Sequence, residues 1–301
     1  MTQIDPVSDG ITLVCCSFNR RSALQYTLPS RQQMIGILEI LVVLDGSTDG
    51  SAEYVAEVAE GDPRVRLIEL AHGGVQRARN HAVSMVRTPW MLMIDDDDLC
   101  PPDYGLKLAE TATDLGADIV GAPWLNAGDV PLGERLQESI GAATTSIDFR
   151  SHPSTFTLDA LVTPFLFSAI LARREVVASV GYDPTYAGNS WREETDFFLR
   201  CREAGYVVAR TPETYTWMDR RFSGGHARSP LRYEYWILRN EWRFLRRHRR
   251  ALSELTPGWS GPVLEVLKTS APRVASLLRS GVRKIFESLR HSRRNLGGQG
   301  R

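Results

Sequence analysis

Four consecutive aspartates, Asp95 to Asp98, follow an apolar run that ends at Ile94. Adjacent carboxylates repel one another, and at the exit of a buried strand that repulsion is costly without a nearby cation. Mg2+ and Mn2+ prefer oxygen ligands, commonly one or two carboxylates together with substrate phosphates. The run therefore favours a divalent metal site over a solvated acidic turn before Pro101.

Two other polar clusters carry groups that suit a nucleotide. Asp45 ends a second apolar run, and its carboxylate could accept hydrogen bonds from a base or a ribose hydroxyl. The residues after Asp45 also suit a turn and a helix cap, and Asp49 is the expected cap. Arg77 and Arg79 could bind a phosphate or a neighbouring acid, or could lie solvated on a helix.

Carboxylates also cluster at Glu193, Glu194 and Asp196, where the pattern predicts the start of a helix. The helix dipole stabilises negative charge at that end, so the cluster could simply cap the helix. A carboxylate beside a metal-bound nucleotide could instead act as a general base. Farther along, His226 follows two glycines and could lie at the surface or add an imidazole ligand to a metal.

Two common phosphate-binding motifs are missing from the sequence. It contains no GxxxxGK[ST] motif, which excludes a P-loop. The first predicted strand is followed by Ser17-Phe18-Asn19 and not by GxGxxG, which excludes a dinucleotide fingerprint. A nucleotide must therefore be held in another way.

Apolar runs and amphipathic segments alternate over the first 122 residues and must position these clusters. They predict strands at 11–16, 40–44, 65–70, 90–94 and 118–122, and helices at 21–33, 51–60, 75–86 and 102–115. Continuous apolar runs indicate strands buried on both faces, as in a doubly wound, mostly parallel α/β sheet flanked by helices. Ligands of such sheets bind at the carboxyl ends of the strands, where Asn19, Asp45 and Asp95 stand.

The alternation breaks down after about residue 125. Beyond it the pattern predicts strands at 163–173 and 206–210 and helices at 133–140, 174–180, 193–204, 231–249 and 263–289. The last segment interleaves apolar and basic residues, so we expect a basic helical C-terminal extension.

The composition is that of a globular protein, because 43% of the 301 residues are hydrophobic and 24% are charged. No run of 18 apolar residues is present, and the first ten residues lack a basic segment. We therefore expect neither a transmembrane helix nor a secretory signal. The cysteines form no CxxC pair and are interpreted as reduced, buried thiols, which favours the cytoplasm.

The formal net charge of zero hides an uneven distribution. Residues 220–301 contain 19 Lys and Arg against 5 Asp and Glu, a net charge of +14, whereas residues 1–219 carry −14. A basic segment favours an anionic partner such as a phosphate or an acidic membrane. We expect peripheral contact with the inner face of a membrane through residues 273–294 and no nucleic-acid partner; the alternative is a packed helix with a solvated basic face.

In this order, the clusters resemble those of the family 2 glycosyltransferases with the GT-A fold. The matching motifs are Phe18-Asn19-Arg20, Asp45-Gly46-Ser47-Thr48-Asp49, Ala78-Arg79-Asn80, Asp95-Asp96-Asp97 and Glu193-Glu194-Thr195-Asp196. Leu44 stands where the family has a first acid, and Glu194 stands where it usually has an Asp. The resemblance is strong over residues 11–122, weaker over 163–210, and lapses past residue 250.

The resemblance implies an inverting, metal-dependent transfer of a sugar from a nucleoside-diphosphate sugar, usually of UDP or TDP, to an acceptor hydroxyl. The implied donor-binding residues are Phe18, Asn19, Arg20, Asp45, Arg79, Asp95 and Asp96. The implied ligands of Mn2+ or Mg2+ are Asp97, Asp98 and His226. The implied catalytic base is Glu194 or Asp196, of which we favour Glu194.

The resemblance also implies how the chain is divided. Residues 1–125 would bind the donor, residues 126–250 would bind the acceptor within the same domain, and residues 251–301 would form the basic extension. The acceptor could be a cell-surface glycan, a lipid-linked molecule or a small molecule. Two other functions stay open: a nucleotidyltransferase of similar sheet topology, and an inactive relative that binds anionic surfaces.

Overall fold

The computed structural model describes residues 10–126, 131–218, 230–271 and 273. The chain divides into two compact units, residues 1–236 and 237–301. Both sheets and the candidate site lie in the first unit.

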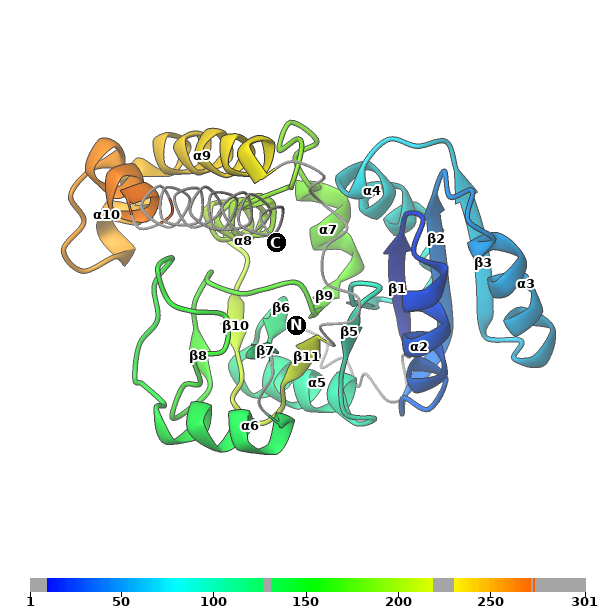
Figure 1. The fold of residues 1–301 in the computed structure, drawn as a ribbon. Helices are drawn as coiled ribbons and strands as arrows, with labels where there is room; N and C mark the ends of the chain where they lie inside the picture. The colour runs from blue at the N-terminus through cyan, green and yellow to red at the C-terminus, as the bar shows by residue number, and fades with distance from the viewer. Residues whose placement is uncertain (1–9, 127–130, 219–229, 272, 274–301) are drawn as a thin grey trace, which may run out of the picture. The chain divides into compact units, whose positions relative to one another are not determined.

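The first unit is built on an eight-stranded mixed sheet (Figure 1). All of its strands run in the same direction except β9 and β8, so the sheet is mostly parallel, as predicted. Their spatial order is β3 (Val65–Leu70), β2 (Ile37–Asp45), β1 (Ile11–Ser17), β4 (Trp90–Met93), β9 (Ile170–Arg173), β6 (Ile119–Gly121), β10 (Val208–Arg210) and β8 (Leu161–Val162).

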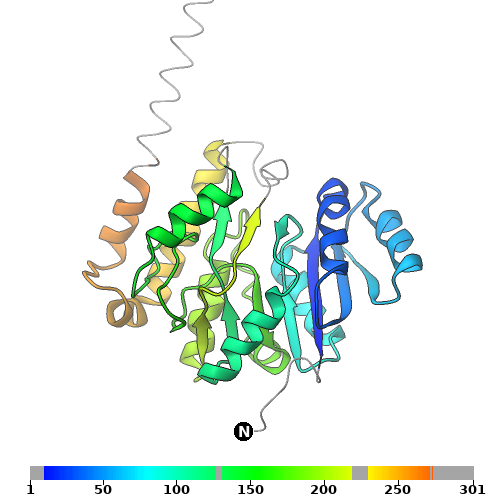
Figure 2. The same ribbon diagram turned by 90° about the horizontal axis from the view of Figure 1, so that it is seen from below.

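Helices cover both faces of this sheet (Figures 1 and 2). One face packs against α2 (Arg21–Gln32), α3 (Ser51–Gly61) and α5 (Tyr104–Leu115). The other packs against α4 (Val75–Met85), α7 (Arg174–Val180) and α8 (Glu193–Glu203). The arrangement confirms the predicted α/β fold class.

The strand β1 shows why the predicted strands are continuously apolar. Leu13 and Cys15 join the buried cluster that contains Leu24 of α2. Val14 points to the opposite face and joins the cluster that contains Ala78 of α4. Because successive side chains of a strand alternate between the two faces, a strand buried on both sides needs apolar residues throughout.

Two features of the first unit depart from the predictions. The expected strand at 163–173 is wrong in length, because only Ile170–Arg173 is a strand, and it runs antiparallel between β4 and β6. A second, three-stranded sheet was not predicted. It contains β5 (Asp98–Leu99), β11 (Thr216–Met218) and β7 (Trp124–Asn126). The predicted short helix near 133–140 is confirmed as α6 (Leu132–Gly141).

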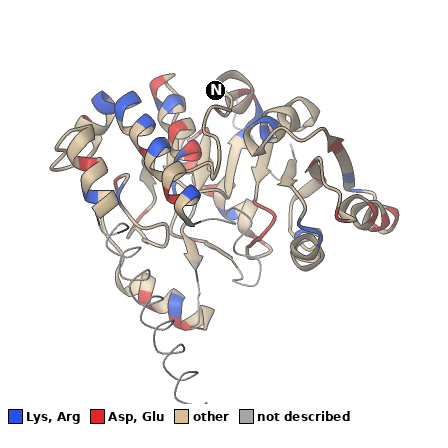
Figure 3. Ribbon diagram, turned by 45° about the horizontal axis from the view of Figure 1, so that its top comes forward, with Lys and Arg blue, Asp and Glu red and all other residues tan. Residues whose placement is uncertain are grey.

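Basic residues follow one another along α9 (Pro230–Arg247) and continue into α10 (Arg249–Leu255) (Figure 3). The chain is helical again at residues 262–271. The second unit begins at residue 237, and the basic extension expected from residue 251 stays a prediction. Apart from Arg273, the segment expected to contact a membrane lies outside the described residues. Among the described residues, no helix is both long and apolar enough to cross a membrane.

Candidate active site

A cavity of about 410 Å3 opens at the carboxyl ends of β2, β1 and β4, the edge where the sequence predicted a ligand. Pockets of this size commonly hold small molecules and cofactors. The cavity lies within the first unit and also reaches the start of α8. Most of the predicted site residues line it: Phe18, Arg20, Asp45, Arg79, Asp95, Asp96, Asp97 and Glu194.

The strand order arranges these residues in a row. Asp45 ends β2, Ser17 ends β1, Asp95 follows β4, and Phe167 precedes β9 at the same edge. Neighbouring strands lie about 4.8 Å apart, so the row from β2 to β9 extends over roughly 14 Å. The cavity therefore has two ends, with the aspartates between them.

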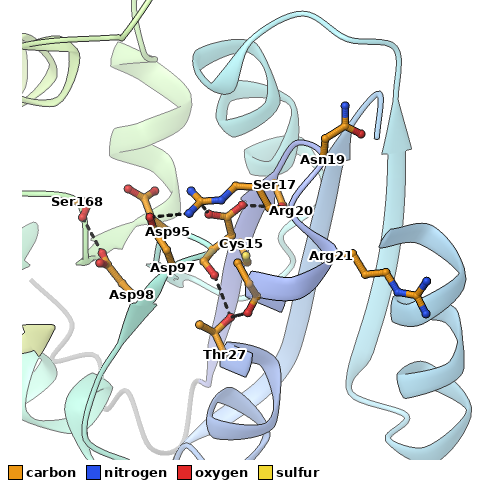
Figure 4. Close-up of polar contacts among 12 residues, drawn as sticks. Cys15, Ser17, Asn19, Arg20, Arg21, Thr27, Asp95, Asp97, Asp98 and Ser168 are labelled. Carbon is orange, nitrogen blue, oxygen red and sulfur yellow. Dashed lines mark hydrogen bonds and ion pairs between the residues drawn. The ribbon is translucent and has the colours of Figure 1, made fainter. Parts of the chain in front are cut away.

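Arg20 holds two of the four aspartates (Figure 4). Its Nη1 lies 2.9 Å from Asp96 Oδ1, and its Nη2 lies 2.9 Å from Asp97 Oδ2. Ser17 Oγ donates a hydrogen bond to Asp96 Oδ2 at 2.5 Å. Burial raises the pKa of Asp96 to about 7 against the opposing effect of Arg20, and burial also raises the pKa of Asp97. Burial thus makes the charged forms of these carboxylates costly, and Arg20 supplies a compensating positive charge.

Arg79 of α4 links the aspartates to the acidic start of α8. Its Nη2 lies 2.6 Å from Asp95 Oδ1 and 3.2 Å from Glu194 Oε1, and its Nη1 pairs with Glu193 Oε1. Burial lowers the pKa of Arg79, but the three carboxylates outweigh burial and raise it well above its usual value. Arg79 therefore stays charged and holds the two acidic segments together.

Glu194 presents a partly exposed carboxyl group to the cavity. It lines the cavity, and 22% of its side chain is exposed. Burial raises its pKa well above the usual value, Asp95 and Glu193 add to that rise, and Arg79 opposes it. Groups of this kind serve as general bases when they lie within reach of a substrate hydroxyl.

The structure does not bring Asp196, the alternative base, to the cavity. Asp196 is fully buried, and its Oδ2 lies 2.7 Å from Arg200 Nε. Its Oδ1 accepts a hydrogen bond from the Tyr186 hydroxyl at 3.0 Å. Two residues along a helix correspond to a rotation of about 200°, so Asp196 and Glu194 point to opposite sides of α8.

Asp98, a predicted metal ligand, also faces away from the cavity. Trp124 Nε1 donates a hydrogen bond to its Oδ1 at 2.7 Å, and Ser168 Oγ donates one to its Oδ2 at 2.9 Å (Figure 4). Its side chain does not line the cavity, because Asp98 begins β5 in the second sheet. Burial and the neighbouring acids raise its pKa well above the usual value. The other predicted ligand, His226, lies outside the described residues.

Asp45 organises the opposite end of the cavity. Its Oδ1 accepts a hydrogen bond from the Gly73 N–H at 2.7 Å, and its Oδ2 accepts one from the Gly74 N–H at 2.8 Å. Beside it the ring of Phe18 stacks on His72, with the centroids 4.1 Å apart. A half-exposed aromatic ring next to a carboxylate is a surface on which a nucleobase could stack.

Asn19 does not line the cavity but positions the loops around it. It adopts a left-handed conformation with φ of 52°, and its Oδ1 accepts a hydrogen bond from the Thr48 N–H at 2.7 Å. In Figure 4 its side chain points away from the aspartates. Asp49 accepts hydrogen bonds from the Arg21 and Ser51 N–H groups, which ties the same two loops together at the start of α3.

The predictions missed part of the cavity wall. Phe167, Asn189, Ser190 and Arg192 line it, together with Trp191. Ser190 and Arg192 have left-handed φ values of 56° and 68°, which non-glycine residues rarely adopt. Trp191 and Arg192 directly precede the acidic cluster in the sequence. Nothing in the sequence indicated that they face a cavity.

The carboxylates at the centre of the cavity fit a hard divalent cation. Asp95 and Asp97 both line the cavity and carry the oxygen donors that such a cation prefers, and Mg2+ commonly needs only one or two carboxylates beside substrate phosphates. Within the described residues, no group of three or more His, Cys, Asp or Glu side chains is arranged to hold a metal by itself. Protein ligands and a bound phosphate would therefore have to act together.

Comparison with known proteins agrees with this geometry. The family model described as Glycosyl transferase family 2 matches residues 12–181, more than half of the chain. Glycosyltransferase GlyA of Streptococcus pneumoniae is 34% identical over 114 residues, which cover 38% of this chain and 16% of that protein. Succinoglycan biosynthesis protein ExoM of Rhizobium meliloti is 24% identical over 258 residues, which cover 82% of this chain and 77% of that protein.

Solved structures show the same fold. The mannosyltransferase PcManGT from Pyrobaculum calidifontis, in complex with GDP-Man and Mn2+, matches with a TM-score of 0.53 and 17% identity. That match covers 92% of this chain and 80% of the other. S. aureus TarS 1-349 in complex with UDP-GlcNAc matches with a TM-score of 0.53 and 15% identity, over 78% of this chain and 65% of the other.

The chain spans less than a third of the length of three curated relatives, EpsH and EpsJ of Bacillus subtilis and GlyA. The family model, by contrast, covers the strands and the aspartates that form the site. The chain belongs to glycosyl transferase family 2, and its fold is of the GT-A type.

Proposed function

We propose that this protein transfers a sugar from a nucleoside-diphosphate sugar to an acceptor hydroxyl, with inversion at the anomeric carbon. The observation that supports it best is the cavity itself. One continuous space joins Asp45, the aspartates that follow β4, and the cavity-facing Glu194. This space would bind the nucleobase at Asp45, the diphosphate at the aspartates and the acceptor hydroxyl at Glu194.

The nucleotide would lie at the end of the cavity formed by β2 and β1. Phe18, stacked on His72, offers a ring on which the base could lie, and Asp45 offers a carboxylate for its N–H groups or the ribose. A uridine or thymidine diphosphate sugar is the expected donor. The TarS structure holds UDP-GlcNAc and the PcManGT structure holds GDP-Man, so the test must include guanosine.

Asp97, together with Asp95, would hold Mn2+ or Mg2+ at the centre of the cavity. When bound, the cation would neutralise charge on the leaving nucleoside diphosphate. Arg20 already pairs with Asp96 and Asp97, so it keeps these carboxylates in place at the cavity wall. Arg79 fixes Asp95 relative to Glu194.

Glu194 would accept the proton of the acceptor hydroxyl as that oxygen attacks the anomeric carbon. Attack on the face opposite the leaving diphosphate inverts the configuration in one step, with no covalent intermediate on the protein. Arg79 orients the Glu194 carboxylate through the contact at 3.2 Å. The acceptor would be a glycan, a lipid-linked molecule or a small molecule, reached from a peripheral position on the inner face of a membrane.

A donor-cleavage assay tests this function. The intact protein would be incubated with UDP-, TDP- and GDP-sugars, Mn2+ or Mg2+, and a mixture of saccharides. Release of one nucleoside diphosphate, with a new glycoside of inverted configuration by NMR, is the expected result. Retained configuration would contradict the one-step mechanism. A parallel reaction would supply a nucleoside triphosphate and a sugar 1-phosphate instead; formation of a nucleoside-diphosphate sugar with release of pyrophosphate there would contradict the whole proposal.

A further inference from the structure

Besides Phe18, two aromatic side chains line the cavity, those of Phe167 and Trp191. Phe167 precedes β9, the fourth strand along the row that starts at β2. Trp191 precedes α8, which packs against β10 on the same side of the sheet. Glu194, the proposed base, lies in the first turn of α8, three residues after Trp191.

A guanidinium group lies near the face of each of the two rings. Arg192 Cζ lies 5.2 Å from the centroid of the Trp191 ring, and Arg210 Cζ lies 6.0 Å from that of Phe167. The Trp191 side chain is 36% exposed although it belongs to a cavity wall. An exposed indole in such a wall presents apolar area to whatever enters the cavity.

The backbone that carries Trp191 is held in a strained shape. Ser190 and Arg192, on either side of it, both have left-handed φ values. Gln76 Nε2 donates hydrogen bonds to Ser190 Oγ at 2.8 Å and to Tyr186 O at 3.0 Å, and an Arg192 amino group donates to a backbone carbonyl at 2.8 Å. Strain maintained by several contacts is typical of functional segments, and here it fixes the position of the indole.

The chemistry around Trp191 fits a sugar ring. A pyranose has a face of C–H groups that packs on an aromatic ring, and a rim of hydroxyls that exchange hydrogen bonds. Ser190 and Glu194 supply polar groups beside the indole, and Arg192 adds donors. A lipid tail would exclude water from these polar groups and could exchange no hydrogen bonds with them, at a cost in binding free energy.

We propose that Trp191 is the platform of the acceptor subsite and that it binds a hexopyranose ring of the acceptor. The inference rests on the proposed function and narrows its acceptor to a saccharide. Trp191 lies close in the chain to Glu194, the proposed base, so a ring stacked on the indole has a hydroxyl near that carboxylate. The donor diphosphate would lie at the aspartates.

Fluorine NMR on the intact protein tests the subsite. The protein would be labelled with 5-fluorotryptophan, and the Trp191 resonance would be assigned by its loss in Trp191→Phe. The probes are methyl α- and β-pyranosides of glucose, galactose, mannose and N-acetylglucosamine, added with Mn2+ and the nucleoside diphosphate that binds. At least one methyl pyranoside is expected to shift the Trp191 resonance saturably.

Variants separate the platform from general effects on the fold. Trp191→Ala should raise the dissociation constant of that pyranoside about tenfold, and Trp191→Phe should raise it less, because a ring remains. Both should bind the nucleoside diphosphate within about twofold of wild type. Trp242→Ala is the matched control, because Trp242 is 41% exposed and does not line the cavity; it should change neither affinity. The remaining tryptophan resonances report whether each variant is folded.

Three results would overturn the inference. If the diphosphate binds but no pyranoside shifts the Trp191 resonance, or hexanol shifts it more than any pyranoside, the acceptor subsite is not a saccharide site and the proposed function stands. If Trp191→Ala weakens binding of the nucleoside-diphosphate sugar but not of the diphosphate, the platform holds the donor sugar. If no nucleoside diphosphate binds, the proposed function fails as well.

Discussion

Arg20, Arg31 and Arg79 set the charge of the site from three directions. Arg20 and Arg79 form ion pairs with the aspartates, whereas Arg31 is buried behind them in α2. Arg31 Nη2 donates a hydrogen bond to the carbonyl of Asp95 at 2.5 Å, and its Nη1 donates one to Cys15 Sγ at 2.8 Å. Its positive charge thus lies beneath the carboxylates and fixes the backbone that carries them.

Replacing Arg31 tests this arrangement. Arg31→Met removes the buried donors, so the Asp95 carbonyl loses its partner and the nearby carboxylates lose a compensating charge. We expect the free energy of unfolding to fall by about 1–3 kcal/mol in denaturant titrations. Arg31→Lys should recover part of that loss, because it keeps the charge but has no fork to reach both partners. Equal stability of Arg31→Met and wild type would contradict the assignment.

Glu194→Gln tests the proposed base. The substitution keeps the size of the side chain but removes its ability to take a proton, so kcat should fall about 10^2- to 10^4-fold in the donor-cleavage assay. Affinity for the nucleoside diphosphate should stay within about twofold.

Asp196→Asn provides the contrast on the same helix. It breaks a buried contact with Arg200, so it should lower the free energy of unfolding, by about 3–5 kcal/mol if the charge of Arg200 is left uncompensated. Full activity in Glu194→Gln would exclude Glu194 as the base.

At the scale of elements, one network of hydrogen bonds joins the ends of two helices to the start of β3. Asp62, just after α3, accepts hydrogen bonds from Arg64 Nε at 3.0 Å and from Gln32 Nε2 at 3.1 Å. Arg64 also donates to the carbonyl of Gln32 at 2.6 Å. This junction connects the end of α2, the end of α3 and the start of β3, and so fixes the strand that borders the nucleotide end of the sheet.

The junction predicts a pH-dependent contribution to stability. Hydrogen bonds from Arg64 hold the pKa of Asp62 well below its usual range. A carboxyl whose pKa is lowered by folding stabilises the protein above its unfolded pKa and loses that effect as the pH falls toward its folded pKa. Asp62→Asn should therefore be less stable than wild type by about 0.5–1 kcal/mol at pH 7, since Arg64 is partly solvated. Thermal unfolding from pH 7 to pH 3 should show this difference shrinking below about pH 4. A constant difference over that range would contradict the account.

The elements also show how far the sequence alone could lead. Continuous apolar runs predicted β1 to β4 and the edge at which their polar residues meet, because burial on both faces leaves a strong local pattern. The antiparallel insertion of β9 and the second sheet leave no such pattern, because short strands are paired by distant contacts. The orientation of Asp98 depends on that second sheet, so its position in the acidic run was misleading.

For the whole molecule, charge is separated along the chain. Residues 220–301 carry a net charge of +14, and basic residues recur through α9 and α10 (Figure 3). The apolar and basic residues of 273–294 alternate in sequence at helical spacing. Such segments bind anionic bilayers through buried apolar area together with electrostatic attraction.

Vesicle flotation tests the membrane contact. The full chain should float with vesicles that contain anionic lipid, should not float with neutral vesicles, and should be released at high salt because the attraction is screened. A chain that ends at Arg273 should bind the anionic vesicles more weakly. Equal recovery of the two chains would rule out an anchor in the last residues.

The central claim is that the cavity at the carboxyl ends of β2, β1 and β4 binds a nucleoside diphosphate together with a cation. The most direct measurement is thermal unfolding of the intact protein with UDP, TDP, GDP, ADP or CDP, each with and without Mn2+. One of them is predicted to stabilise the protein only with Mn2+, by about 2.7 kcal/mol at a concentration 100 times its dissociation constant. Asp97→Asn should abolish that shift and Asp98→Asn should retain it, since Asp98 faces Trp124 and Ser168. No shift with any nucleotide, or a shift that Asp97→Asn leaves unchanged, would contradict the account.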